Sequence, residues 1–364
     1  MNTRKIRIGI IGSGGIALAN HLPGFALCPE AQVVALCDSN PDVLAKAGKE
    51  TGIKATFADY QKLIASGDVD AVVIATPNHL HAPIAHAAID AKKHVLCEKP
   101  IAISYAEALG MYKAAEAAAV RHMTAFTYRF VPAMHYMAHL VKSGSIGQPF
   151  HFRAQRFQDW GHRPLGWRQV RKFAGTGEMG DMLSHRIDFG HVLMGRMTRL
   201  VAHTKQFVPQ RGGQPADVED WVSLICDFEV GATGVLESSK LMTGRGEGGR
   251  SPDVCEVNGS EGTLVYQLGK PLEIHVGRKD GSGLETVPVP KEFLKWPGSR
   301  RDPSQGDPLM TFRYDQDVEF IDAIVSNRPC RPSFLDGAAA QAVMDAAVQS
   351  EAQKCWVDVE HPLA

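Results

Sequence analysis

The stretch Ile6-Arg7-Ile8-Gly9-Ile10-Ile11-Gly12-Ser13-Gly14-Gly15-Ile16-Ala17 decides the fold of the first part of the chain. Its apolar half, Ile6–Ile11, predicts a short strand, and a helical pattern, Ala17–Leu27, follows it. Between them stands the spacing G-x-G-x-x-A. The first glycine permits a tight turn, and the second lets the backbone approach a pyrophosphate at the helix N-terminus. The stretch predicts a dinucleotide-binding turn, and we expect its cofactor contacts to come from Gly12, Gly14, Gly15 and Ile16.

An acidic residue follows the next apolar strand, Val33–Cys37. Asp38 stands 24 residues after Gly14, close to the position where a carboxylate can accept hydrogen bonds from the ribose hydroxyls of a dinucleotide. The same charge repels a 2′-phosphate. Ser39 and Asn40 carry no positive charge that would offset it. We therefore expect NAD to be preferred over NADP.

Strands and helices alternate through the first 125 residues. Apolar strands separated by amphipathic helices predict a parallel sheet that is covered on both faces. Ser104 is a plausible cap for the last of these helices. We therefore expect an α/β protein with an N-terminal Rossmann domain over residues 1–125. The further strands are predicted at Ala71–Thr76 and His94–Cys97, and the further helices at Pro41–Thr51, Ala82–Ala91 and Tyr105–Ala119.

The pattern changes after residue 126, where strands follow one another without helices between them. This order predicts a mostly antiparallel sheet in a second domain, residues 126–364. One helix, near Met179–Met194, interrupts the sheet, and two long surface loops are expected at Thr243–Ser251 and Pro297–Pro308. Asp336 is a candidate N-cap for the last helix. The predicted strands are Phe150–Phe157, Trp221–Phe228, Ala232–Ser238 and Val254–Val257, and the final helices, expected to pack back on the first domain, are Tyr314–Ser326 and Asp336–Lys354.

The composition argues against several classes of protein. The 364 residues include 39 basic and 40 acidic side chains, and no long basic run suggests a nucleic-acid or anionic-membrane partner. The N-terminus lacks a signal-peptide pattern, and no apolar run reaches the roughly 20 residues that span a bilayer. Seven cysteines are scattered singly, which favours buried free thiols. We expect a cytoplasmic protein.

Polar residues follow two more of the predicted strands. Ligands of an open parallel sheet bind beyond the carboxyl ends of its strands, so these segments are candidates for the site. Lys99 could donate a hydrogen bond to a substrate oxygen, although a solvated lysine or one paired with Glu98 is an equal alternative. His79 and His81 are more often ordinary polar residues than metal ligands. From these segments we expect cofactor contacts by Thr76, Pro77, Asn78, His81, Glu98 and Lys99.

Asp181, His185 and Asp188 recur at i, i+4 and i+7, which places them on one face of the predicted helix. A histidine suits proton transfer near neutral pH without much adjustment of its pKa. The alternatives are a surface pair or half of a metal site. Because no matching ligand stands at metal spacing nearby, we expect no metal.

The order of these motifs resembles the glucose–fructose oxidoreductase, inositol dehydrogenase and rhizopine-catabolism family, Gfo/Idh/MocA, over nearly the whole chain. The E-K-P segment, residues 98–100, and the D-x-x-x-H helix are together far more specific than the glycine motif. The segments that carry the likeness are the glycine motif, Asp38, T-P-N-x-x-H at 76–81, E-K-P, Tyr128-Arg129-Phe130, Trp167-Arg168, and the helix with Asp181 and His185.

The resemblance implies a C-terminal α/β domain whose open sheet forms oligomer contacts, and so a homo-oligomer, a dimer or tetramer. It implies that Lys99 and His185 are catalytic, with Asp181 as their partner. It also implies a cis peptide at Lys99-Pro100 and a carbohydrate or cyclitol substrate. The implied substrate contacts are Lys99, Arg129, Trp167, Arg168, Asp181 and His185, and Arg129 is also expected to contact the cofactor.

In this interpretation His185 takes the hydroxyl proton, Lys99 stabilises the developing alkoxide, and the nicotinamide takes the hydride. The segment from Gln155 to Arg171 is rich in Arg, Trp and Gln. It could cover a sugar face, or it could brace two domains or subunits. One departure from the family pattern is Glu178, one turn ahead of Asp181, whose charge would be new at the site if it points inward.

Three functions remain open from the sequence. The first is a dehydrogenase or reductase for a hydroxyl or ketone of a sugar, glycoside or cyclitol, with imine reduction as a variant. The second is a glycosidase that uses tightly held NAD⁺ for transient oxidation and elimination. The third is a nucleotide-sensing regulator without catalysis, and the presence of Lys99, Asp181 and His185 together argues against it.

Overall fold

The computed structural model describes residues 4–247 and 253–361, and the chain divides into two compact units. The part of the chain after residue 126, which the sequence interpretation assigns to one domain, contributes two segments to the first unit. Unit 1 comprises Met1–Thr127, Trp296–Ser304 and Arg313–Ala338, and unit 2 comprises Tyr128–Lys295, Gln305–Phe312 and Ala339–Ala364.

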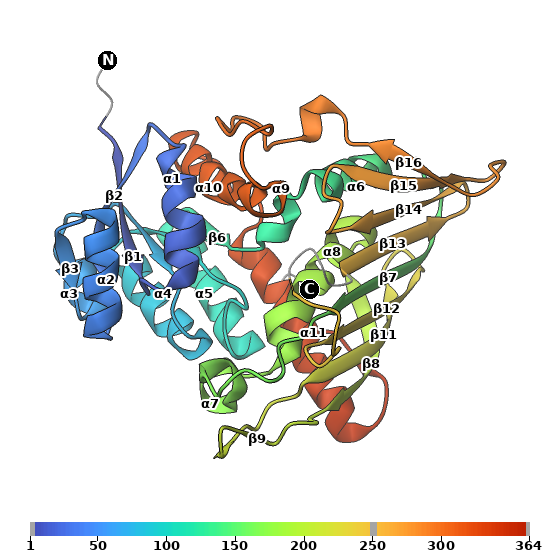
Figure 1. Cartoon of the computed structure of the whole chain (residues 1–364), viewed down its shortest axis with the longest axis horizontal. Coiled ribbons are helices and arrows are strands. Elements are labelled where there is room, and N and C mark those ends of the chain that lie inside the picture. Colours follow the sequence, from blue (N-terminus) through green and yellow to red (C-terminus); the bar gives the residue numbers. More distant parts are fainter. Residues whose placement is uncertain (1–3, 248–252, 362–364) are drawn as a thin grey trace. The chain divides into compact units, whose positions relative to one another are not determined.

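Unit 1 contains the predicted parallel Rossmann sheet, whose order is β3-β2-β1-β4-β5-β6 (Figure 1). The strands are apolar on both faces because helices cover both. All four residues of β4 are buried, for example. The order reverses between β1 and β4, and this point is where such sheets bind their ligands. The strands are β1 Ile6–Ile11, β2 Ala31–Cys37, β3 Ala55–Phe57, β4 Ala71–Ile74, β5 His94–Cys97 and β6 His122–Thr124.

The predicted helices of unit 1 are present, with an irregular first one, but α3 is not among the predicted elements. Asn40 and Ser104 cap α2 and α5 through their side chains, because each accepts a backbone N–H of the first turn. The predicted helix at Ala17–Leu27 is not regular, since it contains a π-turn, η1. The elements are η1 Ala17–His21, α1 Leu22–Ala26, α2 Pro41–Thr51, α3 Tyr60–Ala65, η2 Asn78–Leu80, α4 His81–Asp90, α5 Tyr105–Ala118 and α10 Asp315–Val325.

The last helix, α11, covers Phe334–Gln353, and the prediction that Asp336 caps it is wrong. Ser333 precedes the helix, and its hydroxyl accepts the backbone N–H of Leu335. Asp336 lies inside the first turn, and its carboxylate accepts the backbone N–H and the hydroxyl of Ser333. The Asp336 carboxylate therefore satisfies both donors of Ser333, and the Ser333 hydroxyl satisfies a backbone donor of the first turn, much as in a capping box.

Unit 2 is built on a mixed, largely antiparallel sheet of nine strands. Only β12 and β7 run parallel among its paired strands in the described residues. A short hairpin, β9 Gln210–Arg211 with β10 Gln214–Pro215, stands apart. In order, the nine are β16 Leu284–Pro288, β15 Glu273–Arg278, β14 Gly262–Gln267, β13 Asp253–Gly259, β7 Pro149–Phe157, β12 Thr233–Ser239, β11 Trp221–Phe228, β8 Met197–Lys205 and β17 Val357–Asp358.

Two helices of unit 2 pack on this sheet, α6 on β14 and β15, and α8 on β7 and β13. Figure 1 shows them along the same face. The helix predicted near Met179–Met194 starts as a π-turn, η5, before α8. The remaining elements of this part are α6 Pro132–Lys142, η4 Trp167–Gln169, α7 Arg171–Ala174, η5 Met179–Leu183, α8 Ser184–Met194, η7 Lys291–Phe293 and α9 Pro308–Thr311, with η3 Thr127–Phe130 and η8 Phe312–Tyr314 at unit boundaries.

The two predicted loops differ in how much of them is described. Residues 243–247 of the loop predicted at Thr243–Ser251 form turns, and the rest of it lies outside the described residues. The segment predicted as Pro297–Pro308 is irregular up to α9.

All seven cysteines are free, and six are buried, while Cys355 is exposed. No helix in the described part of the chain combines the length and apolar character that a membrane span requires.

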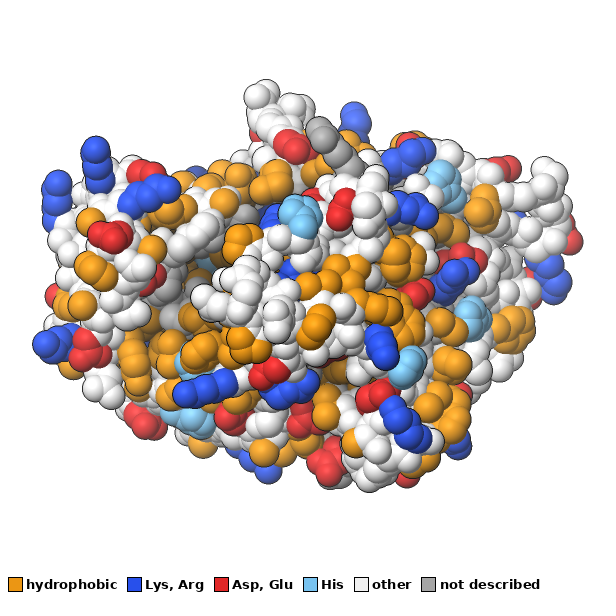
Figure 2. Space-filling model, turned by 60° about the horizontal axis from the view of Figure 1, so that its bottom comes forward, with side chains coloured by type: hydrophobic (Ala, Val, Ile, Leu, Met, Phe, Trp, Pro, Cys, Tyr) orange, Lys and Arg blue, Asp and Glu red, His pale blue; other side chains and the backbone are white. Residues whose placement is uncertain are grey.

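The molecular surface in Figure 2 carries basic and acidic side chains interspersed with hydrophobic ones. On that face the described residues form no broad area of a single charge. This distribution agrees with the nearly balanced 39 basic and 40 acidic residues.

A buried charge cluster ties α8 to the sheet. Asp253 on β13 accepts a hydrogen bond from Arg186 of α8 and lies 3.3 Å from Arg156 of β7, and all three side chains are almost fully buried. The Arg186 guanidinium also lies over the rings of Tyr128 and Phe189. One carboxylate thus serves two buried cations.

Removing that carboxylate charge should destabilise unit 2. The variant Asp253→Asn removes the negative charge that faces the buried Arg156 and Arg186, and we expect the free energy of unfolding to fall by about 3–5 kcal/mol. Urea unfolding followed by circular dichroism measures this loss. The matched control is Asp280→Asn, at an exposed carboxylate of the β15–β16 hairpin. Equal stability of the two variants would contradict the assigned role of Asp253.

Candidate active site

The glycine turn at the end of β1 has the geometry that the sequence predicts. Gly12 has a φ of +93°, and a Cβ there would lie 2.5 Å from the carbonyl oxygen of Ala75, so only glycine fits without strain. At Gly14 and Gly15 an added Cβ would meet nothing within 4 Å. The backbone of these two residues is thus open to an approaching group at the start of a helix, where backbone N–H groups favour an anion.

Asp38, directly after β2, holds the glycine turn. Its Oδ2 accepts the backbone N–H of Ser13 at 2.9 Å, and its Oδ1 accepts that of Asn40 at 2.9 Å. The Ser13 hydroxyl in turn donates to the carbonyl of Cys37. Each carboxylate oxygen retains acceptor capacity for a ribose hydroxyl, because it can accept more than one hydrogen bond.

His81 joins the loops that follow β4 and β5. Its Nδ1 lies 2.9 Å from the carbonyl oxygen of Pro100, and its Nε2 lies 2.9 Å from that of Thr76. Burial lowers the pKa of His81, so the ring is neutral and donates only one of these two hydrogen bonds. The residue fixes the two loops to each other, and its predicted contact with the cofactor stays a prediction.

Lys99 follows β5 and Glu98, and the Lys99-Pro100 peptide is cis. The backbone N–H of Lys99 donates to Oε2 of Glu98 at 3.3 Å. Burial raises the pKa of Glu98, but the hydrogen bond and charge of His21 and the charge of Lys99 outweigh it, and the net shift is downward. Glu98 is therefore an ionised carboxylate beside the lysine.

The residues of unit 1 fit a dinucleotide. The open backbone at Gly14 and Gly15 suits a pyrophosphate, and Asp38 offers carboxylate oxygens for a ribose. Glu98 supplies a second carboxylate at the end of β5. All of these groups belong to loops at the carboxyl ends of β1, β2 and β5.

In unit 2, a buried carboxylate fixes the start of the helical segment that carries Asp181 and His185. Oε1 of Glu219 accepts the backbone N–H of Gly177 at 2.6 Å and that of Met179 at 3.0 Å. A Cβ at Gly177 would lie 2.1 Å from the Glu219 carbonyl oxygen, so the close approach requires glycine. Burial raises the pKa of Glu219, while the hydrogen bonds from these backbone N–H groups lower it in part.

Asp181 lies in η5 and meets the predicted substrate segment. Nε of Arg168 is 3.5 Å from Oδ1 of Asp181, and the Arg168 guanidinium stacks on the ring of Trp167 at 4.3 Å. The side chains of Arg168 and Asp181 are 43% and 20% exposed, so both are accessible to a small ligand. The structure thus brings Trp167, Arg168 and Asp181 together within one unit.

His185, four residues later on α8, is buried, with 2% of its surface exposed. Its ring meets the edge of Tyr128 at a centroid distance of 4.5 Å. Asp188 is also buried and forms a two-point ion pair with Arg129, whose Nε and Nη2 lie 2.7 and 2.5 Å from its oxygens. Arg129 therefore braces α8, and its predicted ligand contacts stay predictions.

Glu178 does point inward, but it adds no charge at neutral pH. The side chain is fully buried and accepts a 2.6 Å hydrogen bond from Ser238. Burial and the charge of Asp181 together raise the pKa of Glu178 to about 8, against the opposing charge of Lys240. The departure from the family pattern is therefore a neutral carboxylic acid.

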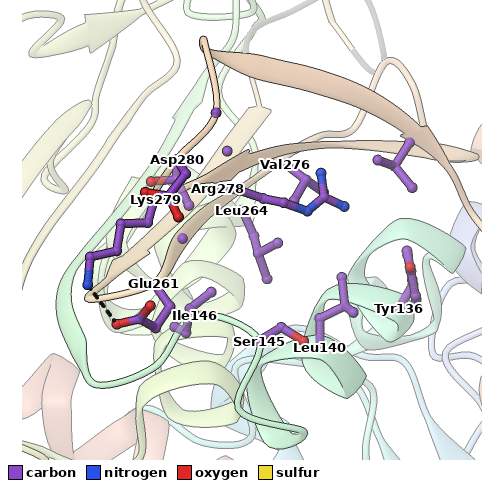
Figure 3. Close-up of a pocket in the computed structure, with 15 residues that line it drawn as sticks. Tyr136, Leu140, Ser145, Ile146, Glu261, Leu264, Val276, Arg278, Lys279 and Asp280 are labelled. Carbon is purple, nitrogen blue, oxygen red and sulfur yellow. Dashed lines mark hydrogen bonds and ion pairs between the residues drawn. The ribbon is translucent and has the colours of Figure 1, made fainter.

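A separate hollow of about 480 Å³ lies between α6 and the strands β14 and β15 (Figure 3). Its charged members include Glu261, which pairs with Lys279 at 3.3 Å, and Arg278, which pairs with Glu285. The rest of the lining is mainly aliphatic side chains and glycines. None of the residues predicted for the site lines this hollow.

Among the described residues, no group of three or more His, Cys, Asp or Glu side chains is arranged to hold a metal.

Sequence reasoning missed two important residues. Glu219 lies two residues before β11 and His21 in the helical segment after the glycine turn, where the sequence around them shows no chemical motif. The partners of these residues are far away in the sequence: Glu219 contacts Gly177 across 42 positions, and His21 contacts Asp317 across 296. A local sequence pattern therefore cannot reveal them.

These features define an NAD-binding oxidoreductase with a Rossmann unit. Residues 6–126 match the model of the oxidoreductase family with an NAD-binding Rossmann fold, and residues 134–265 match the GFO/IDH/MocA C-terminal domain. The chain belongs to the Gfo/Idh/MocA family, as the resemblance predicts. This family includes levoglucosan, inositol and apiose dehydrogenases, and the chain is an oxidoreductase of this family.

Full-length relatives support this assignment. The levoglucosan dehydrogenase of Pseudarthrobacter phenanthrenivorans is 31% identical and matches 98% of each chain. The inositol 2-dehydrogenase of Rhizobium meliloti is 27% identical over 97% of this chain and 99% of its own. A solved levoglucosan dehydrogenase in complex with NADH and levoglucosan superimposes with a TM-score of 0.89 at 32% identity, covering 98% of this chain and 100% of the other.

The protonation of Glu178 should be visible in the pH dependence of stability. Because its folded-state pKa is raised from 4.5 to about 8, the native state holds a proton that the unfolded state releases between these values. Stability should fall as the pH rises through this window. The variant Glu178→Gln should lack that loss and melt higher than the wild type at pH 9, while both melt alike near pH 5.

Thermal unfolding from pH 5 to 9 tests this expectation, with Glu261→Gln as the exposed control. Parallel curves for the wild type and Glu178→Gln would show that Glu178 is ionised in the folded protein and would contradict the assignment.

Proposed function

We propose that the protein is an NAD-dependent dehydrogenase that oxidises a secondary hydroxyl of a sugar, glycoside or cyclitol, and reduces the corresponding ketone. We further propose 1,6-anhydrosugars such as levoglucosan as its first candidate substrates. The observation that carries the proposal is the cluster of Trp167, Arg168 and Asp181 at the start of the helical segment that contains His185. The full-length likeness to a levoglucosan dehydrogenase supports the substrate class.

His185 is the proposed base. Alcohol oxidation releases a proton and a hydride, and an imidazole can accept the proton near neutral pH. Burial against Tyr128 holds the ring in one orientation. Once bound, the nicotinamide cofactor supplies the hydride acceptor, while the protein supplies position and charge.

Lys99 is the proposed donor to the same oxygen. An ammonium group stabilises an oxygen whose negative charge increases as its proton leaves. Glu98 accepts the Lys99 backbone N–H, so the main chain that carries the ammonium is fixed. Lys99 would thereby lower the barrier for the proton transfer that His185 performs.

Asp181 and Arg168 are the proposed substrate anchors. A carboxylate accepts hydrogen bonds from sugar hydroxyls, and a guanidinium donates them. The Trp167 ring, on which Arg168 stacks, offers an apolar face for the C–H side of a sugar. Together the three side chains can recognise both the polar and the apolar surfaces of a carbohydrate.

The proposed preference for NAD over NADP rests on Asp38. Its carboxylate is fixed by the backbone N–H groups of Ser13 and Asn40, so it cannot easily turn away from a 2′-phosphate.

A homo-oligomer also remains a proposal. The exposed Ile225 lies in register with Val235 and Val201 across β11, β12 and β8, which places an apolar row on the sheet. Light scattering would measure the oligomer number.

The assay that tests the proposal follows NADH absorbance with NAD⁺ and a panel of levoglucosan, monosaccharides, glycosides and cyclitols. We expect substrate-dependent NADH formation. No absorbance change together with cleavage of a glycoside would favour the redox-elimination mechanism. Cofactor binding without any turnover or cleavage would favour a regulator, and both results would contradict a dehydrogenase.

The catalytic assignment predicts large losses of turnover. Lys99→Met and His185→Gln should each lower kcat by about 10²–10⁴-fold, the range that general acid–base groups contribute. The controls are Lys113→Met on α5 and His203→Gln on β8, both at exposed side chains. Near wild-type kcat in either catalytic variant would refute that residue's role.

The cofactor assignment predicts a change in selectivity. Asp38→Asn keeps an amide oxygen for the Ser13 N–H but removes the charge that repels a 2′-phosphate. We expect the ratio of kcat/KM for NAD⁺ to that for NADP⁺ to fall at least about tenfold. The measurement uses both cofactors with one sugar from the panel. A ratio that stays constant would show that Asp38 does not discriminate between them.

A further inference from the structure

In unit 1, the buried His21 connects three elements: η1, α10 and the segment after β5. That segment carries Glu98, the residue before Lys99. His21 is the last residue of η1, the π-turn in the helix after the glycine loop, and none of its side chain is exposed. Its Nδ1 lies 2.8 Å from Oδ1 of Asp317 on α10, and its Nε2 lies 3.2 Å from Oε1 of Glu98 after β5. One ring thus bridges two carboxylates.

A carboxylate oxygen faces each ring nitrogen of His21, and this arrangement favours a proton on both. A neutral imidazole has a single N–H and could donate to only one of the two carboxylates, whereas an imidazolium donates to both. Burial lowers the pKa of His21, but the charges and hydrogen bonds of Asp317 and Glu98 outweigh it and raise the pKa to about 10. The ring is therefore a cation at neutral pH.

The bridge is closed on its buried side. Asp317 has no exposed surface, and a Cβ at Gly24 would lie 2.1 Å from its Oδ2, so the helix backbone packs directly on the carboxylate. The ring of Phe25 stacks on that of His21 at 6.4 Å. Burial raises the pKa of the nearby Cys28 thiol, so it stays neutral. Among the described residues, the ionisable neighbours that set the charge of His21 are Asp317 and Glu98.

The other end of the bridge reaches the proposed site. The Glu98 side chain is 17% exposed, and its second oxygen, Oε2, accepts the Lys99 backbone N–H. The contacts therefore run from Asp317 through His21 to Glu98 and then to the main chain of Lys99. A rotation of the Glu98 carboxylate would break both its contact with His21 and its contact with Lys99.

We infer that His21 is a positioning residue: its imidazolium, anchored by Asp317, holds the Glu98 carboxylate in one orientation to accept hydrogen bonds from the ribose of the nicotinamide nucleotide. The inference deepens the proposed function and rests on it, because Glu98 and Lys99 belong to the proposed site. His21 touches neither cofactor nor substrate and acts through Glu98.

A double-mutant cycle on NADH affinity tests the inference. His21→Gln and Glu98→Gln should each raise the Kd for NADH about tenfold, the effect of losing one charged hydrogen bond. The double variant should be no weaker than Glu98→Gln alone, since His21 acts through that carboxylate. Additive losses, or an unchanged Kd in His21→Gln, would overturn the inference. The control is His122→Gln, a buried histidine 2.7 Å from Glu116 in the same unit.

A second measurement holds even if His21→Gln does not fold. Imidazole NMR of the wild type and of Glu98→Gln reports the pKa of His21, which should drop by at least about one unit when the carboxylate charge is lost. A constant pKa would overturn the inference. Both readouts need no turnover. If His21 and Glu98 are coupled but the protein oxidises no sugar, only the dehydrogenase assignment is refuted. If turnover is normal but the Kd losses are additive, only the role of His21 is refuted.

Discussion

The parallel direction of β1, β2, β4 and β5 is the constraint on which the cofactor half of the site depends. Parallel strands end at the same edge of the sheet, so the loops that follow them converge there. The open glycine backbone, Asp38 and Glu98 belong to these loops, and His81 begins the helix α4 that follows the loop after β4. Their hydrogen bonds connect one loop to the next, Asp38 to the glycine turn and His81 to Pro100. The sheet therefore determines where the loops start, and the polar contacts determine their shape.

In the second unit, buried charged side chains fix the position of η5 and α8. The segment that carries Asp181 and His185 is held by three carboxylates that come from or meet other elements: Glu219 at its first turn, Asp188 against Arg129, and Asp253 against Arg186. The two ion pairs, Asp188 with Arg129 and Asp253 with Arg186, are costly to bury unless both partners are present, so the loss of one partner destabilises the unit strongly. This arrangement keeps a mostly buried histidine in a fixed place beside an accessible aspartate.

Local signals made the first unit predictable from sequence. Its apolar strands, glycine turn and capped helices are encoded within about 20 residues of one another, and the structure confirms the parallel sheet they predict. The sequence did less well where structure depends on distant partners. The short strands β3 and β6 were missed because three residues carry little pattern. The edge strand β16 and its neighbour β15 were missed because polar, glycine-rich sequence is hard to distinguish from loop.

At the site, too, local sequence patterns did not reveal the π-turns or the buried ion pairs. Asp181, His185 and Asp188 were expected on one regular helix face, but η5 changes the start of that helix and Asp188 is committed to Arg129. Glu178 was recognised as unusual, yet its neutral state depends on burial next to Ser238 and on the charge of Asp181. His21 gave no signal at all, since its partner Asp317 is 296 positions away.

The central claim is direct hydride transfer from a sugar carbon to the nicotinamide. The most direct measurement follows deuterium from a sugar labelled at the oxidised carbon, levoglucosan first, into the reduced cofactor by NMR. The account predicts that the label appears on the nicotinamide ring and is retained in isolated NADH. Deuterium that is lost to water, or that returns to a cleaved sugar product without net NADH, would contradict it.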